Sequence, residues 1–124
     1  MALTLNEYQL EALRTESDNG IDITSTKYKV HPFAAKLNNG LQGLNGEAGE
    51  AIDILKKHIY QGHELDIEHI AKELGDVAWY LAVSAYAIGY DLETICQMNI
   101  DKLKDRYPGG FDADLSMNRK ENDI

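Results

Sequence analysis

The stretch GEAGEAIDILKKHIYQGHELDIEHIAKELGDVAWY spans residues 46–80 and carries the main structural signal of the chain. It contains two acidic pairs, Glu47 with Glu50 and Glu73 with Asp76. Each pair has the spacing i, i+3, which places both side chains on one face of a helix, about one turn apart. On a helical wheel the same faces carry apolar residues that should turn toward the core. The sequence therefore predicts carboxylates in or beside the apolar stripes of two consecutive helices.

The two pairs are predicted to lie at the same level of a helical hairpin. Gly62 interrupts the helical pattern about twelve residues after Glu50 and eleven before Glu73. Because a helix rises about 1.5 Å per residue, this mismatch is negligible. Converging carboxylates need positive charge, either from Lys and Arg or from a hard divalent cation. Oxygen-only sites suit Mg²⁺ or Mn²⁺, and the candidate ligands are Glu47, Glu50, Glu73 and Asp76.

Ordinary surface ion pairs and a di-iron centre are the alternatives to a site of this kind. Solvated helix faces with surface ion pairs account for most single acidic pairs, but they account less well for two pairs on apolar stripes. A di-iron centre uses Glu-x-x-His motifs, whereas Glu50 and Asp76 occupy the positions of those histidines. The four histidines are scattered, and we expect them to be surface or loop residues: His31, His58, His63 and His69.

Length and composition bound the class of protein. A chain of 124 residues is expected to form one domain with a modest core, which gains from oligomerisation. The formal net charge of −9 argues against binding to a nucleic-acid backbone. The single cysteine, Cys96, fits a reducing compartment. No apolar run reaches the roughly 18 residues of a membrane span, and no signal segment is evident. We therefore predict a cytoplasmic protein that binds neither nucleic acid nor membranes.

Helical periodicity and capping patterns predict four helices, at about 4–15, 33–59, 67–88 and 92–107. Thr4 with Glu7 forms a capping-box pattern, and Asp66 and Asp91 are plausible N-caps. The predicted domain covers residues 1–111, with an N-terminal helix and arm over 1–32 and the site-bearing helices over 33–111. Residues 21–30 are expected to form a loop or irregular arm, and 112–124 a polar tail with little structure of its own.

The second and third helices carry signals of close packing. Glycines recur every three residues, at Gly40, Gly43, Gly46 and Gly49, and each costs a helix about 0.5–1 kcal/mol relative to alanine. We favour helix packing along this ridge as the reason, although room for a ligand beside the acids is compatible with it. After Asp76 the third helix is apolar on nearly every side, and such a helix must be covered all round. A subunit interface is therefore expected on it.

Candidate partners for phosphate groups lie near the end of the fourth helix. Lys102 and Arg106 have the spacing i, i+4, and Asn99 falls on the same side. Cations in a last helical turn are explained equally well by the helix dipole. Tyr80, four residues after Asp76, shares the face of the acids, where it either flanks a nucleobase or belongs to the core.

Taken together, these motifs resemble the MazG-like nucleoside triphosphate pyrophosphohydrolases. The resemblance covers about residues 37–111 and includes Glu47-x-x-Glu50, Glu73-x-x-Asp76 and the ending Lys102-Leu103-x-x-Arg106-Tyr107-Pro108. It implies an all-α fold, a four-helix bundle of the all-α NTP pyrophosphatase type, assembled as a dimer or tetramer. A tryptophan-rich base pocket, as in dCTP-preferring relatives, is not recognisable, so the base preference stays open.

The resemblance also implies a reaction, which is Mg²⁺-dependent cleavage of an NTP or dNTP to the monophosphate and pyrophosphate in nucleotide-pool housekeeping. Glu47, Glu50, Glu73 and Asp76 would be the metal ligands, and Lys102 and Arg106 would contact phosphates, with Asn99 and Tyr80 as further substrate-binding candidates. We favour Glu50 over Glu47 as the general base. Two alternatives are a phosphoribosyl-ATP pyrophosphohydrolase and a non-catalytic helical oligomerisation module with a structural cation.

Overall fold

The computed structural model describes residues 2–17 and 27–124. These residues form five helices and no strand, so the all-α prediction is confirmed. The helices are α1 (Leu5–Leu13), α2 (Ala34–Gln61), α3 (Ile67–Ala87), α4 (Leu92–Arg106) and α5 (Ala113–Met117). No helix within the described ranges combines the length and hydropathy of a membrane span. Most of the arm predicted at 21–30 lies outside the described residues, and 27–30 have no regular structure.

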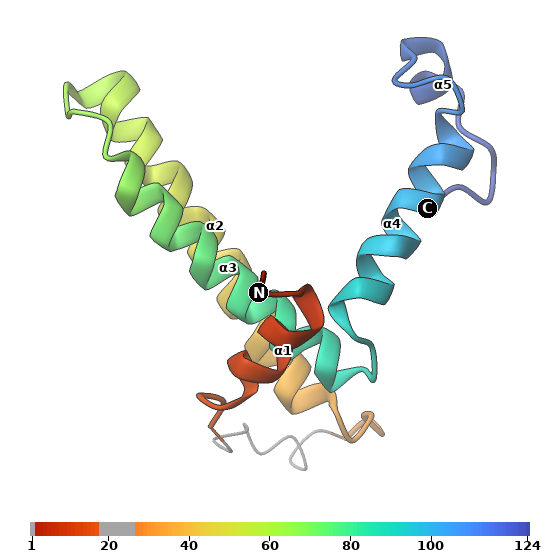
Figure 1. Cartoon of the computed structure of the whole chain (residues 1–124), viewed down its shortest axis with the longest axis horizontal. Helices are drawn as coiled ribbons and strands as arrows, with labels where there is room; N and C mark the ends of the chain where they lie inside the picture. Colours follow the sequence, from red (N-terminus) through yellow and green to blue (C-terminus); the bar gives the residue numbers. More distant parts are fainter. Residues whose placement is uncertain (1, 18–26) are drawn as a thin grey trace.

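The helices form two arms that diverge from a common base (Figure 1). Helices α2 and α3 lie side by side in one arm, while α4 and α5 occupy the other, and α1 lies where the arms meet. Helix α4 contacts α1 and α3 near this junction. The described residues of one chain therefore do not close into a four-helix bundle, they form five helices rather than the predicted four, and the predicted assembly of such a bundle as an oligomer stays a prediction. The pattern of apolar residues predicts a buried face for each helix, but it does not say whether the covering helix comes from the same chain.

The predicted helix ends are confirmed by the backbone geometry. The Thr4 hydroxyl accepts a hydrogen bond from the Glu7 amide at 3.1 Å, and the Glu7 carboxylate accepts one from the Thr4 amide at 3.3 Å. The carboxylates of Asp66 and Asp91 each accept a bond from the amide three residues further on, at 2.9 and 2.7 Å. Gly62 ends α2 with a φ of 73°, a left-handed conformation that glycine adopts at little cost.

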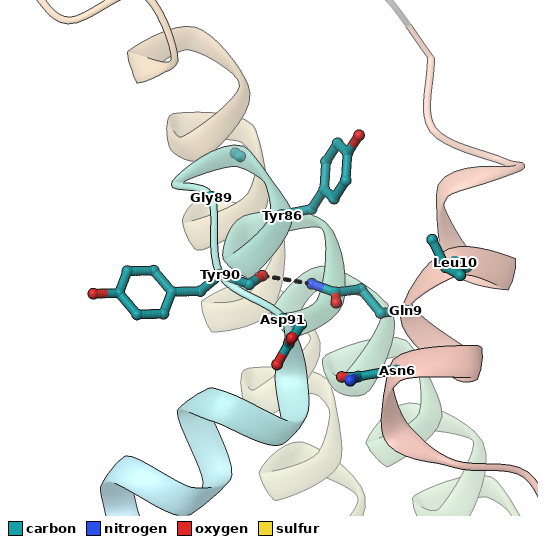
Figure 2. A pocket seen from close by; sticks show the side chains of 8 residues that line it. Asn6, Gln9, Leu10, Tyr86, Gly89, Tyr90 and Asp91 are labelled. Carbon is teal, nitrogen blue, oxygen red and sulfur yellow. Dashed lines mark hydrogen bonds between the residues drawn. The ribbon is translucent and has the colours of Figure 1, made fainter.

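A buried amide ties the two arms to α1 (Figure 2). The Gln9 side chain donates hydrogen bonds to the carbonyls of Ala82 at 3.2 Å and Tyr90 at 2.9 Å, and it accepts one from the Leu92 amide at 3.2 Å. Satisfying both ends of the amide allows it to be buried without the penalty of an unpaired polar group. Gln9 therefore fixes the start of α4 relative to the end of α3, beside an open cavity of about 670 Å³.

Trp79 has a packing role at the junction of the arms. Its ring packs against the small core formed there. The indole N–H donates to the Ala12 carbonyl at 3.1 Å and to the Thr15 hydroxyl at 2.8 Å. Trp79 therefore anchors the end of α1 onto α3 one turn beyond the acidic pair of that helix.

The glycine ridge of α2 divides into two halves. A methyl group on Gly40 would collide with the hydroxyl of Ser84, and one on Gly43 would collide with the ring of Tyr80. Apart from the adjacent residues and the backbone of α2 itself, nothing in the described chain lies within 4 Å of a methyl group at Gly46 or Gly49. The packing interpretation is therefore confirmed for the first two glycines, while the other two leave open space beside the acids.

Alanine substitutions should separate these two halves. Gly43→Ala is expected to lower the free energy of unfolding by about 1–3 kcal/mol, because the Tyr80 ring must move. The matched variant Gly49→Ala should raise it by about 0.5–1 kcal/mol, because alanine is the better helix former. Chemical denaturation measures both changes, and equal effects of the two substitutions would contradict the packing interpretation.

Apolar side chains remain exposed on both arms of the single chain. On α3 they are Ile67, Leu74, Leu81 and Tyr86, and on α4 they are Met98, Ile100 and Leu103. Within the chain α3 buries chiefly small residues, including Ala82 and Ala85. These surfaces agree with the expected subunit interface, which stays a prediction.

The prediction of a tail with little structure is wrong. Residues 113–117 form α5, whose start is capped by the Asp112 carboxylate through bonds from the amides of Asp114 and Leu115 at 2.8 and 3.1 Å. Beyond α5 the chain folds back, so that Asp123 pairs with Arg106 of α4. Capping by Asp112 and a specific ion pair give this polar segment an order that its composition does not reveal.

Candidate metal site

Three acidic side chains converge midway along the α2–α3 hairpin. Glu47 of α2 and Glu73 and Asp76 of α3 each bring one carboxylate oxygen to a point where all three lie within 4.8 Å of one another. Glu47 is half-buried, Glu73 is buried and Asp76 is exposed. The sequence predicts that the acids of the two helices converge, and three of the four residues do so.

Glu50 lies beside this cluster rather than within it. Its side chain is exposed, and together with Glu73 it lines an open cavity of about 470 Å³. Gly46 and Gly49 line the same cavity, which explains why these two glycines face open space. Glu50 is thus placed at the solvent side of the acids, one helical turn from Glu47.

Glu73 is the most constrained member of the cluster. Its exposed fraction is 8%. One carboxylate oxygen lies 3.0 Å from Nε2 of His69, whereas Oε2 is buried without a hydrogen-bond partner. A buried carboxylate oxygen without a partner is costly. A cation bound between the acids would remove this cost, and the oxygen-only donor set suits Mg²⁺ or Mn²⁺.

Crowding of the carboxylates changes the protonation of Glu47. The pKa of its carboxyl is raised from 4.5 to about 7, first by a hydrogen bond with Glu73 and then by desolvation and by the charges of Glu50 and Asp76. Without a cation, the cluster therefore holds a proton near neutral pH. A divalent cation would compete directly with that proton.

The cost of the metal-free cluster should be visible as pH-dependent stability. Between pH 4.5 and about 7 the folded state binds the Glu47 proton more tightly than the unfolded state, so the contribution of Glu47 to stability falls as pH rises. In EDTA we expect the melting temperature of the wild type to fall relative to that of Glu47→Gln across this interval. Mg²⁺ should restore the wild type at high pH and act weakly at low pH. Parallel pH profiles of the two proteins in EDTA would contradict this.

A second hollow borders the cluster on the side toward α1. This open cavity of about 400 Å³ is lined by Thr15, Trp79 and Tyr80 together with Glu47 and Asp76. The rings of Trp79 and Tyr80 meet edge to face, with centroids 5.0 Å apart. Tyr80 therefore belongs to the helix packing, through its approach to the glycine ridge, and also lies at the edge of the acidic site. Contact of its ring with a nucleobase stays a prediction.

The basic candidates are not brought to the acids of their own chain. Asn99, Lys102 and Arg106 lie on α4, in the arm that diverges from the α2–α3 hairpin (Figure 1). The side chain of Arg106 is engaged by Asp123. Within one chain, the structure therefore gathers Glu47, Glu73 and Asp76, with Glu50 and Tyr80 at their margin, and leaves the α4 residues apart.

His69 is the site residue that the sequence interpretation missed. The sequence pattern predicts an ordinary surface histidine, but His69 contacts the Glu73 carboxylate from one turn earlier on α3. The signal was present, because His69 and Glu73 have the spacing i, i+4 of helix neighbours. A histidine at this position orients the carboxylate, in the way that groups around a metal site often fix its ligands.

Comparisons with known proteins bear on the same segment. The family model described as the MazG nucleotide pyrophosphohydrolase domain matches residues 36–111, which include both acidic pairs and the basic residues of α4. A curated relative is the "Gene 37 protein" of Mycobacterium phage L5, which is 36% identical over 72 residues. These are 55% of this chain and 63% of the phage protein, so the chain covers less than two thirds of that relative. No solved structure gives a significant match to the chain.

Proposed function

Because the chain belongs to the MazG nucleotide pyrophosphohydrolase family, we propose that it is a Mg²⁺-dependent nucleoside triphosphate pyrophosphohydrolase. The substrate class is an NTP or dNTP, and the products are the monophosphate and pyrophosphate. The observation that carries the proposal is the buried, unpartnered Oε2 of Glu73 within a cluster of carboxylates. A role in nucleotide-pool housekeeping rests on the family resemblance.

The acids divide into those that hold the cation and one that is free to move a proton. Glu47, Glu73 and Asp76 would hold Mg²⁺, with Glu50 able to complete the set. When bound, the ion neutralises triphosphate charge and lowers the pKa of a coordinated water. Glu50 lies at the solvent-exposed edge and is least committed to the cluster. We therefore assign it the proton of the attacking water, with Glu47 as the alternative base.

The phosphate contacts are proposed to come from a second copy of the chain. Lys102 and Arg106 suit a polyphosphate chemically, but they lie in the arm that diverges from the hairpin bearing the acids. If they serve the same reaction, they must reach the acids of a neighbouring subunit. The exposed apolar side chains of α3 and α4 provide a surface for such a homo-oligomer.

A panel of NTPs and dNTPs tests the proposed reaction. With Mg²⁺, the purified protein should release pyrophosphate from at least one of them, and EDTA should abolish the release. Glu50→Gln should lower kcat by about 10²–10⁴-fold while Mg²⁺ binding, measured by calorimetry, persists. Release from none of the nucleotides would contradict the proposal. Mg²⁺ that raises the melting temperature without any turnover would indicate a structural cation instead.

A further inference from the structure

A half-buried ion pair fastens the segment after α5 onto α4. Arg106 donates from Nε to Oδ2 of Asp123 and from Nη2 to Oδ1, both at 2.6 Å. Each side chain is only 10% exposed, which makes this the most buried ion pair between described residues. The two parallel bonds form the fork-to-fork arrangement in which a guanidinium binds either a carboxylate or a phosphate.

Two further cations belong to the same two segments as this ion pair, Lys102 on α4 one turn before Arg106 and Arg119 four residues before Asp123. The bonds from Arg106, followed by the charges of Arg119 and Lys102, hold the pKa of Asp123 below its ordinary range. We call Lys102, Arg106 and Arg119 the cationic cradle. In a chain of net charge −9, the charges of these three cations act on one carboxylate, and Arg106 bonds to it directly. Arg119 is not among the residues that the sequence patterns select.

We infer that the cationic cradle is a polyphosphate-binding site and that Asp123 is its built-in competitor, occupying the guanidinium fork that a triphosphate needs. The inference rests on the proposed function for the identity of the ligand. It adds Arg119 to the phosphate contacts and assigns a regulatory role to the segment after α5.

Exchange of Asp123 for a phosphate leaves no charge of the ion pair without a partner or water. Removing one partner of an ion pair that is largely withdrawn from water is destabilising, because the other charge stays unpaired. Here the phosphate takes over both bonds to Arg106 while Asp123 passes into water, so neither charge stays buried alone. Asp123 sits in a turn closed by a bond from its amide to the Lys120 carbonyl at 3.0 Å. Opening this turn releases the carboxylate without unfolding α5.

Calorimetric titration with inorganic tripolyphosphate in EDTA tests the inference without metal or turnover. Asp123→Asn should bind tripolyphosphate about tenfold more tightly than the wild type, because a charged competitor of the fork is gone. Asp123→Glu keeps the charge and should bind like the wild type. Glu11→Gln is the matched control, because it removes an acid from an exposed ion pair with Arg14 near the end of α1, away from the cradle, and it should also bind like the wild type.

The variant Arg119→Gln provides an independent test of the cationic cradle. It should weaken tripolyphosphate binding about fivefold or more, since a charge-assisted contact is lost. If Asp123→Asn loses its helical circular dichroism, the Arg119→Gln result decides. Unchanged or weaker binding by folded Asp123→Asn, or unchanged binding by Arg119→Gln, overturns the inference and leaves Asp123 as a structural clasp.

Failure of the inference about Asp123 can be told apart from failure of the proposed enzyme activity. If no nucleotide is hydrolysed but Asp123→Asn still binds tripolyphosphate more tightly, the cradle stands as an anion site and the enzyme proposal fails. If the wild type hydrolyses a nucleotide and Asp123→Asn shows neither tighter binding nor a lower KM, the competitor role fails alone.

Discussion

Replacing Glu73 by glutamine is expected to lower Mg²⁺-dependent pyrophosphate release by about 10²–10³-fold or more. Glu73 is the buried centre of the acidic cluster, and its unpartnered Oε2 is the atom that most needs a cation. Glutamine keeps the shape and the contact with His69 but removes the charge. Steady-state kinetics measures the loss, and Mg²⁺ titration by calorimetry should show weakened binding in parallel.

The same substitution should leave the metal-free fold intact or strengthen it. Glutamine removes a buried charge whose Oε2 has no partner, and its amide can still form a hydrogen bond with the Glu47 carboxyl, the first cause of the raised pKa of Glu47. The matched control is Glu68→Gln, because Glu68 lies on α3 but forms an exposed pair with Lys72 outside the cluster. Its activity should equal that of the wild type. Activity of Glu73→Gln within about threefold of the wild type would remove Glu73 from the metal site.

Features set by neighbouring residues were predictable from the sequence. The caps at Thr4, Asp66 and Asp91 and the stop at Gly62 depend on side chains within one helical turn of the backbone they satisfy. The level of the acidic pairs followed from helix rise and a short turn, which is again local geometry. Three of the four acids converge as that arithmetic required, and the exposed Glu50 shows that a shared helix face fixes a side chain only to within a turn.

Features set by distant contacts were not predictable. The apolar pattern of α4 predicts an inner face, but the same face serves a bundle within one chain or an interface between two. The divergence of the arms depends on contacts such as Gln9 with the backbone at Tyr90 and Leu92, which connect residues more than 80 positions apart. The pairing of Arg106 with Asp123 likewise cannot be predicted from the sequence, because the segment that carries Asp123 has the composition of a disordered tail.

Because the two arms diverge, the acids and the cations of one site are expected to come from different subunits, and this can be tested by restoring activity to a mixture of two inactive variants. If acids and cations of one site come from different subunits, two inactive variants should complement each other. Glu73→Gln lacks a working acidic cluster, and Lys102→Ala lacks a phosphate contact but keeps the Arg106–Asp123 pair. Each alone should lose about 10²-fold or more of the wild-type activity.

Co-expression of the two variants with different affinity tags should restore turnover. In a mixed dimer, one site joins both damaged parts, whereas the other joins the intact acids of one chain to the intact α4 of its partner. Random pairing then gives about a quarter of the wild-type activity per chain, and doubly purified mixed dimers about half. Glu73→Gln paired with Asp76→Asn is the control and should stay inactive, because every site then lacks an acid. If mixed dimers form and remain inactive while each variant is folded, Lys102 does not serve a neighbour's acids, and the two arms then carry separate sites.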